Sequence, residues 1–193
     1  MACRRHGALN PHAQLRQPLT LDAYIESPFV VEPLRRADCC LVSDGGGALV
    51  LMSADTAREL KVPMPIPILG IGQAQTSCDI HLREDLTSTC AAQSAHHAFA
   101  MAGLKPRDID VAQIYDCFTI AVLMTLEDYG FFPKGQGRHF LSDGQIEWGG
   151  RLPINTSGGL LSETGMPGLQ LIMEGVRQMR GTAKLQVSGA RHC

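Results

Sequence analysis

The sequence predicts an α/β fold, and two observations carry this prediction. Short apolar segments typical of strands alternate with helical segments along the second half of the chain. Glycine-rich or proline-rich connections separate these segments, so each one begins and ends at a turn signal. With 193 residues, of which 45% are hydrophobic, the chain is long enough to bury a core around such an alternation.

The first 37 residues are proline-rich and show no period, so they are expected to form loops. The stretch "CCLVSDGGGALVLMS", residues 39–53, has two apolar runs around a triple glycine and predicts two strands. Ser53 is placed to cap a short helix over "ADTARELKV". The triple glycine is a weak phosphate signal, because the Lys-Ser/Thr pair of a P-loop does not follow it.

The second half of the chain repeats the order of strand and helix. Strands are predicted at 66–73, 111–115 and 184–187, and helices at 85–103, directly after Asp116, and from Pro167 to Arg180. Helix 85–103 carries a face of small residues able to pack closely on a neighbour, at Ala91, Ala95, Ala98 and Ala102. The connection at 131–159 is long and rich in glycine, which is typical of a functional loop.

Charge and cysteine content exclude several kinds of function. A net charge of −2 with 17 Lys and Arg gives no basic surface for nucleic acid or an anionic membrane. The apolar runs are too short to cross a bilayer, and the N-terminal residues lack an apolar signal core, so a cytoplasmic protein is expected. Seven cysteines without metal-site spacing predict reduced thiols and no metal, and the adjacent Cys39 and Cys40 would point to opposite faces of a strand.

The first candidate site is the segment "IYDCF". Asp116 is placed to cap the following helix, which would put Cys117 in its first turn, where the helix dipole favours the thiolate and lowers the pKa. Tyr115 would add a phenol as hydrogen-bond donor or acid beside that thiol. The alternative is that the cysteine and the tyrosine simply pack in the core.

The second candidate site is the loop "NTSGGLLSETGMPG". Its glycines, which include Gly158, Gly159 and Gly165, leave backbone N–H groups free to hold an oxyanion or a thioester carbonyl. Asn155 would add a side-chain donor. The alternative is a flexible surface loop.

Four stretches in order resemble one protein family: "RRHGALNPHAQ", "SPFVVEPLRRADCCLVSDGGGALVL", "GLKPRDIDVAQIYDCF" and "NTSGGLLSETGMPGLQLIMEGVRQMRG". The chain resembles the C-terminal half of a thiolase-superfamily protein of the sterol-carrier-protein or lipid-transfer-protein branch. The resemblance implies a thiolase-like C-terminal domain, a mixed sheet with βαβ units and layered helices, at 63–193. Residues 1–62 would then be a remnant of the N-terminal half with a loop segment.

The resemblance also implies roles for the first candidate site. That branch reads His-Asp-Cys-Phe where this chain has Tyr115 to Phe118, and its cysteine is the acid/base thiol of the reaction. A tyrosine before the aspartate resembles the retro-aldol lyases of steroid side-chain CoA esters, in which the tyrosine takes the proton. Two departures stand out, because no cysteine here matches the thiolase nucleophile of the first half, and Met166 stands where relatives have the histidine of Gly-His-Pro. The chain stops at Cys193, about where one more strand is expected, so an open sheet edge is expected there.

The resemblance implies an enzyme subunit or fragment that makes or breaks a carbon–carbon bond next to a CoA thioester, as an acyltransferase or by a retro-aldol route. The CoA thioester would be the substrate, with no further cofactor. Expected partners are a second copy of the chain, an N-terminal-half companion, or a zinc-ribbon/OB-fold companion. A non-catalytic interaction or acyl-binding protein and an inactive fragment remain the alternatives.

Overall fold

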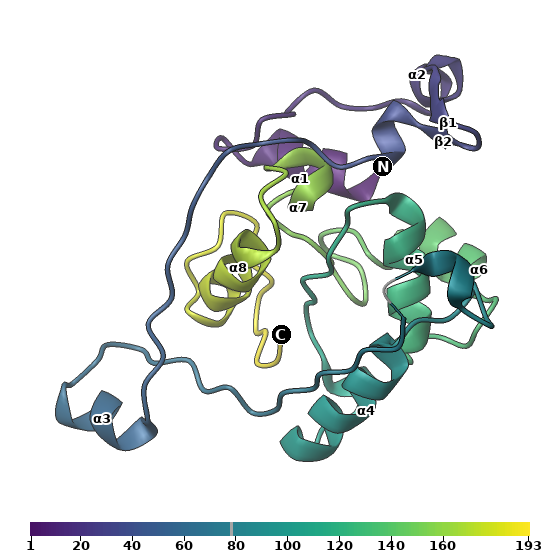
Figure 1. Cartoon of the computed structure of the whole chain (residues 1–193). Coiled ribbons are helices and arrows are strands. Elements are labelled where there is room, and N and C mark those ends of the chain that lie inside the picture. The colour runs from purple at the N-terminus through teal and green to yellow at the C-terminus, as the bar shows by residue number, and fades with distance from the viewer. Residues whose placement is uncertain (78) are drawn as a thin grey trace.

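The computed structural model describes residues 1–77 and 79–193, which form helices, two short strands and long extended segments (Figure 1). The α-helices are α1 (Ala2–Leu9), α2 (Leu21–Glu26), α3 (Ala54–Glu59), α4 (Ala91–Ala102), α5 (Thr119–Asp128), α6 (Gly137–Ser142), α7 (Gly159–Ser162) and α8 (Leu169–Met179). Strands β1 (Phe29–Val31) and β2 (Leu34–Arg35) pair antiparallel, and single 3-10 turns lie at Arg36–Asp38, Ile80–Leu82 and Pro106–Asp108. Among the described residues, no helix is both long and apolar enough to cross a membrane.

The core is built around the predicted strand 111–115. This segment is extended, with Val111, Ala112 and Ile114 buried, and it lies parallel to residues 152–155 through an isolated bridge between Ala112 and Ile154. Two backbone hydrogen bonds hold the pair, from Ala112 N to the Pro153 carbonyl and from Asn155 N to the Ala112 carbonyl, each at 3.0 Å. One face of α5 packs against this pair, and the buried members of the cluster are Ile109, Ala112, Ile114, Val122, Leu126, Phe132, Leu152 and Ile154.

The other predicted strands are not paired in ladders. Segment 66–73 is extended, and segment 39–52 makes one isolated bridge, between Cys39 and Phe118, while residues 184–187 form a turn rather than a strand. A strand needs a neighbour for its backbone groups, and in the described part of the chain the paired strands with named bounds are β1 and β2. Figure 1 shows a long excursion of the chain between residues 42 and 75, with α3 at its far end.

The prediction of a loop over residues 1–37 is wrong. Helix α1 is largely buried and packs on α7, and α2 follows with the β1–β2 hairpin. The buried face of α1 consists of Ala2, Cys3, His6 and Gly7, so it carries no large apolar residues at helical spacing. A Cβ on Gly7 would lie 2.3 Å from Ser162 Oγ, which shows how closely the two helices approach.

The helix predictions are largely confirmed. Ser53 caps α3, since its hydroxyl accepts from Thr56 N at 3.1 Å. Helix α4 begins later than predicted, at Ala91, and ends at Gly103, which has a φ of +67°. The small face of α4 meets segment 66–73, because a Cβ on Gly70 would lie 2.1 Å from the Ala98 carbonyl oxygen.

Candidate active site

Asp116 lies at the centre of the candidate site and is fully buried. Its carboxylate accepts from Leu160 N at 2.8 Å and from Leu161 N at 3.2 Å, and the Cys3 thiol donates to it at 3.5 Å. The aspartate therefore holds the first turn of α7, and the predicted role as cap of its own helix is wrong. Burial raises its pKa, while the two backbone N–H groups oppose that shift.

Cys117 is not in the first turn of a helix. Helix α5 begins at Thr119 with Phe118 as its N-cap residue, so Cys117 still belongs to the extended segment. Burial raises its pKa, and neighbouring Cys40 and Asp116 add to that shift. The predicted lowering of this pKa by the helix dipole is therefore wrong, and at neutral pH Cys117 is a thiol.

Tyr115 and Cys117 project to the same side of the segment, opposite the buried Asp116, because side chains alternate along an extended chain. Tyr115 is 48% exposed, and burial of its phenol raises its pKa, with further contributions from Cys117 and Cys40. The ring faces Gly168, where a Cβ would lie 3.7 Å from Tyr115 Cδ2. Tyr115 and Cys117 are thus neighbours on one side of the segment, and their common catalytic role stays a prediction.

The Asn155 side chain holds the backbone of segment 111–115 in place. It is fully buried and has a φ of +46°. Its Oδ1 accepts from Ile114 N at 2.7 Å, and its Nδ2 donates to the Ile114 carbonyl at 2.9 Å. Both ends of the amide thus bind the backbone just before Tyr115, so Asn155 orients that residue and does not point its carbonyl or amide into the solvent.

The glycine-containing loop at residues 155–168 packs closely against the rest of the candidate site. Gly158 and Gly159 have φ values of +113° and +61°, which favour glycine, and a Cβ on Gly159 would lie 2.3 Å from Asp116 Oδ2. The N–H of Gly158 donates to the Asn155 carbonyl at 2.8 Å, and the N–H of Gly165 donates to Ser43 Oγ at 2.9 Å. These two N–H groups have internal acceptors, so the oxyanion-binding role predicted for the loop gains no support from them.

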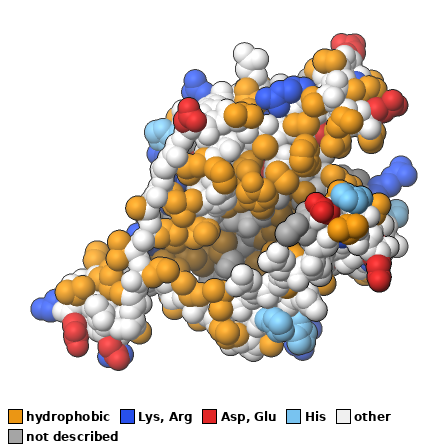
Figure 2. All heavy atoms as spheres, viewed as in Figure 1, with side chains coloured by type: hydrophobic (Ala, Val, Ile, Leu, Met, Phe, Trp, Pro, Cys, Tyr) orange, Lys and Arg blue, Asp and Glu red, His pale blue; other side chains and the backbone are white. Residues whose placement is uncertain are grey.

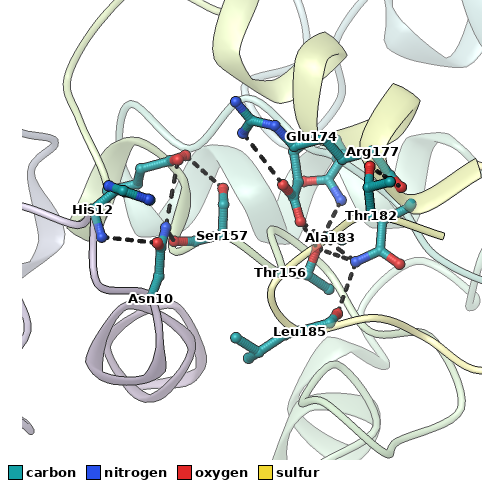
Figure 3. Close-up of polar contacts among 12 residues, drawn as sticks. Asn10, His12, Thr156, Ser157, Glu174, Arg177, Thr182, Ala183 and Leu185 are labelled. Carbon is teal, nitrogen blue, oxygen red and sulfur yellow. Dashed lines mark hydrogen bonds and ion pairs between the residues drawn. The ribbon is translucent and has the colours of Figure 1, made fainter. Parts of the chain in front are cut away.

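Two buried carboxylates hold the loop from the other side (Figure 3). Glu163 accepts from Ser157 Oγ at 2.5 Å, and Asn10 Nδ2 contacts it at 3.5 Å. Glu174 accepts from Thr156 Oγ1 at 2.7 Å and lies 3.6 Å from the Arg177 guanidinium. Sequence reasoning missed both glutamates, because Glu163 stands in the predicted glycine-rich loop and Glu174 in a predicted helix, and neither pattern indicates a buried carboxylate.

Helix α1 supplies two further residues that the sequence did not predict for the site. Cys3 contacts Asp116, and burial raises the pKa of its thiol. His6 is buried, its Nε2 accepts from Trp148 N at 2.9 Å, and its Nδ1 therefore carries the proton and donates to the Asn155 carbonyl at 3.2 Å. Burial lowers the pKa of His6, which keeps this tautomer neutral. The only sequence signal for α1 was the family-like stretch "RRHGALNPHAQ".

Glu163 makes the stability of the folded protein depend on pH. Burial raises its folded-state pKa, with Glu174 adding to the shift and Ser157 opposing it. A raised pKa means that the stability contributed by Glu163 is present below its unfolded pKa of about 4.3 and is lost as pH rises through the folded value. We expect wild type to lose stability relative to Glu163→Gln as the pH rises above about 4.3, measured by urea unfolding at each pH; a constant difference would contradict this.

Gly165 allows the loop to cross segment 41–43. A Cβ at this position would lie 1.8 Å from the Leu41 carbonyl oxygen and 2.2 Å from its carbon, which are backbone atoms. Gly165→Ala is expected to lower the free energy of unfolding by about 1–3 kcal/mol. Gly46→Ala is the matched control, because a Cβ there meets nothing within 4 Å. Equal effects of the two substitutions in urea unfolding would refute the close approach.

Comparison with known proteins identifies one family. The family described as "Thiolase C-terminal domain-like" matches residues 72–193. A "17-hydroxy-3-oxo-4-pregnene-20-carboxyl-CoA lyase" of Mycobacterium tuberculosis is 40% identical over 197 residues, covering 100% of this chain and 51% of that protein. A "steroid side-chain-cleaving aldolase" of Thermomonospora curvata is 43% identical, covering 93% of this chain and 47% of the relative. The chain thus spans about half the length of these curated relatives.

Two solved structures are similar. One, titled "Ltp2-ChsH2(DUF35) aldolase", is 39% identical with a TM-score of 0.91, covering 98% of this chain and 51% of that chain. The other is a monomeric "SCP2-thiolase like protein type 1" from Mycobacterium smegmatis, with a TM-score of 0.69 at 18% identity, covering 93% of this chain and 39% of that chain. The second likeness supports the fold alone.

Proposed function

Because the chain belongs to the thiolase C-terminal domain-like family, we propose that it forms part of an enzyme that makes or breaks a carbon–carbon bond next to a CoA thioester. The observation that carries the proposal is the placement of Tyr115 and Cys117 on one accessible side of a buried segment. Asp116, on the opposite side, fixes that segment to α7. Two weak acids are thus presented to a substrate from a rigid support.

The retro-aldol route suits these residues better than acyl transfer. Breaking the bond between the α- and β-carbons of a β-hydroxyacyl-CoA transfers the β-hydroxyl proton to a base or to solvent as the β-carbon becomes a carbonyl. The other product is an enolate, whose α-carbon must receive a proton. The raised pKa values of Tyr115 and Cys117 keep both groups protonated at neutral pH, so either is able to donate that proton. Two relatives named as lyase and aldolase support this choice, whereas acyl transfer would need a nucleophile.

The substrate in this proposal is an acyl-CoA, and no further cofactor takes part. In this proposal Asn155 and the glycines at 158, 159 and 165 have an indirect role. They hold the backbone around Tyr115 and Asp116 in place, so that the side chains on this backbone meet the substrate. We also place the protein in the cytoplasm, and we keep the division into residues 1–62 and 63–193, the latter as the thiolase-like domain.

A companion chain completes the proposal. The extended segments expose large apolar side chains, among them Val42 at 96%, Val50 at 81% and Ile68 at 70%. Figure 2 shows apolar side chains gathered over a hollowed face of the molecule. An apolar face of this kind is typical of an interaction surface. We propose that an N-terminal-half companion or a zinc-ribbon/OB-fold companion binds the chain, with a homodimer as the alternative; the paired name "Ltp2-ChsH2" of the similar solved structure supports a hetero-oligomer.

The test is turnover. The purified chain, alone and mixed with a thiolase N-terminal half or a zinc-ribbon/OB-fold protein, is incubated with a β-hydroxyacyl-CoA, and the shortened acyl-CoA is measured by chromatography. We expect product in a mixture with a companion and a strong loss of product with Cys117→Ala. Absence of product in every mixture would refute the catalytic proposal.

A non-catalytic acyl-binding role is the second candidate, and one observation favours it. A cavity of about 310 Å³ lies between α1, α5 and the region around Leu141 and Ile146. Its wall includes Leu19, Val122 and Leu161, while Arg4 and Glu147 are its charged members. Binding of a fluorescent fatty-acyl probe that Val122→Trp abolishes, without turnover in the experiment above, would favour this role.

A further inference from the structure

Cys40 and Cys117 lie opposite each other on two adjacent extended segments. The N–H of Cys40 donates to the Cys117 carbonyl at 2.9 Å, and the next pair, Cys39 and Phe118, forms an antiparallel bridge. Directly opposite residues in such a pairing project to the same face, with Cβ atoms about 4.5–5.5 Å apart. The Cα separation typical of a hydrogen-bonded pair, about 5.5 Å, lies within the range of about 4.4–6.8 Å that a disulfide spans. The Cβ atoms must move together to about 3.5–4.5 Å for the bond to form.

Both thiols are free and half-buried, so small reagents have access to them. The two sulfurs also interact electrostatically, since Cys40 contributes to the raised pKa of Cys117 after the larger effect of burial. The neighbouring Cys39 points to the other face, where its thiol contacts the Arg35 carbonyl at 3.5 Å. The sequence prediction that Cys39 and Cys40 face opposite sides agrees with this contact, and Cys40 is the one that shares a face with Cys117.

We propose that Cys40 and Cys117 are a modification site at which hydrogen peroxide forms a reversible intramolecular disulfide. One thiol attacks the peroxide, becomes a sulfenic acid and releases water. The second thiol then attacks the sulfenic sulfur, the S–S bond forms, and the hydroxyl leaves as a second water. Two electrons pass from the thiol pair to the peroxide O–O bond, and a dithiol reagent restores both thiols.

The disulfide would remove the Cys117 thiol from beside Tyr115 and fix residues 39–41 to residues 115–118. This consequence for activity rests on the proposed function. Formation of the bond does not, because it depends only on the position of the two sulfurs. Chemical detection of the bond and inhibition of turnover therefore test separate claims.

The full-length chain is treated with hydrogen peroxide, digested without reduction and analysed by mass spectrometry. We expect an intramolecular link between the peptides that carry Cys40 and Cys117, with the loss of two hydrogens and reversal by dithiothreitol. Phenylarsine oxide, which bridges two close thiols, is expected to bind at one equivalent and to protect both cysteines from alkylation. If the reduced protein catalyses turnover, peroxide should inhibit wild type far more than Cys40→Ser.

Cys39 and Cys40 are adjacent, so variants assign the link. Cys39→Ala should still form the disulfide, whereas Cys40→Ala and Cys117→Ala should each lose it and bind the arsenical more weakly. Circular dichroism and urea unfolding confirm that each variant is folded. A link that persists in Cys40→Ala, or sulfenic acid trapped on Cys117 without any link in wild type, would overturn the proposal.

Discussion

Asp116→Ala is expected to lower the free energy of unfolding by about 2–4 kcal/mol. The substitution leaves the N–H groups of Leu160 and Leu161 without their acceptor in a site that water does not reach. Each orphaned buried donor costs about 1–3 kcal/mol. Removing a carboxylate whose pKa burial has raised offsets part of this cost, so the net loss falls below the sum of the two donors.

Urea unfolding of wild type and variants measures this effect. Asp116→Asn keeps one carbonyl oxygen as an acceptor and should lose less stability than Asp116→Ala. Asp110→Ala is the matched control, because Asp110 also accepts from two backbone N–H groups, those of Arg191 and His192, at 2.8 and 3.0 Å near the surface. Water replaces that carboxylate, so a loss below about 1 kcal/mol is expected. Equal losses for Asp110→Ala and Asp116→Ala would refute the central role of Asp116.

Asp116 also shows where the sequence was informative and where it was not. The sequence located the aspartate at the end of a buried strand-like segment, and the burial of Val111, Ala112 and Ile114 agrees with that prediction. Local rules then assigned it to the helix that follows, because an aspartate before a helix is a common N-cap. The carboxylate binds α7 instead, 44 residues later in the chain. No single-sequence pattern encodes that long-range choice.

The strand predictions failed for a related reason. Segments 39–52 and 66–73 have the composition of strands and are extended, yet they lie without continuous ladders. Composition predicts that a segment is able to form a strand, whereas pairing depends on a neighbour that the sequence of the segment does not specify. For α1 the error was the opposite: a loop was predicted where a helix forms. The buried face of this helix consists of small and polar residues, so it gives no hydrophobic period.

The sequence found Tyr115 and Cys117 by their motif but assigned the wrong electrostatics. The expected low pKa of Cys117 depended on a helix that begins two residues later, at Thr119. The pair with Cys40 was not predictable, because the two cysteines are 77 positions apart and meet through backbone pairing. Residue identity thus indicated the candidate residues, and tertiary packing determined the direction in which burial shifts their pKa values.

Tyr115→Phe is expected to lower kcat of the active assembly by about 10²–10⁴-fold, the usual contribution of a positioned acid or base. The substitution keeps the ring against Gly168 and removes only the hydroxyl. KM should change little, because the lost group acts on the proton and not on the binding of CoA. Burial raises the pKa of Tyr115 above its ordinary value of about 10, so the phenol remains protonated across the neutral range. Deprotonation of Tyr115 should therefore not lower the activity below about pH 10.

Tyr129→Phe provides the matched control for this experiment. Burial raises the pKa of Tyr129 as well, but its ring packs near Phe131, with the centroids 6.4 Å apart, at the end of α5 away from Cys117. Initial rates with a β-hydroxyacyl-CoA across pH 6 to 9 compare the two variants with wild type. If Tyr115→Phe retains activity similar to that of Tyr129→Phe, the phenol is not the proton donor, and Cys117 becomes the residue on which the retro-aldol proposal depends.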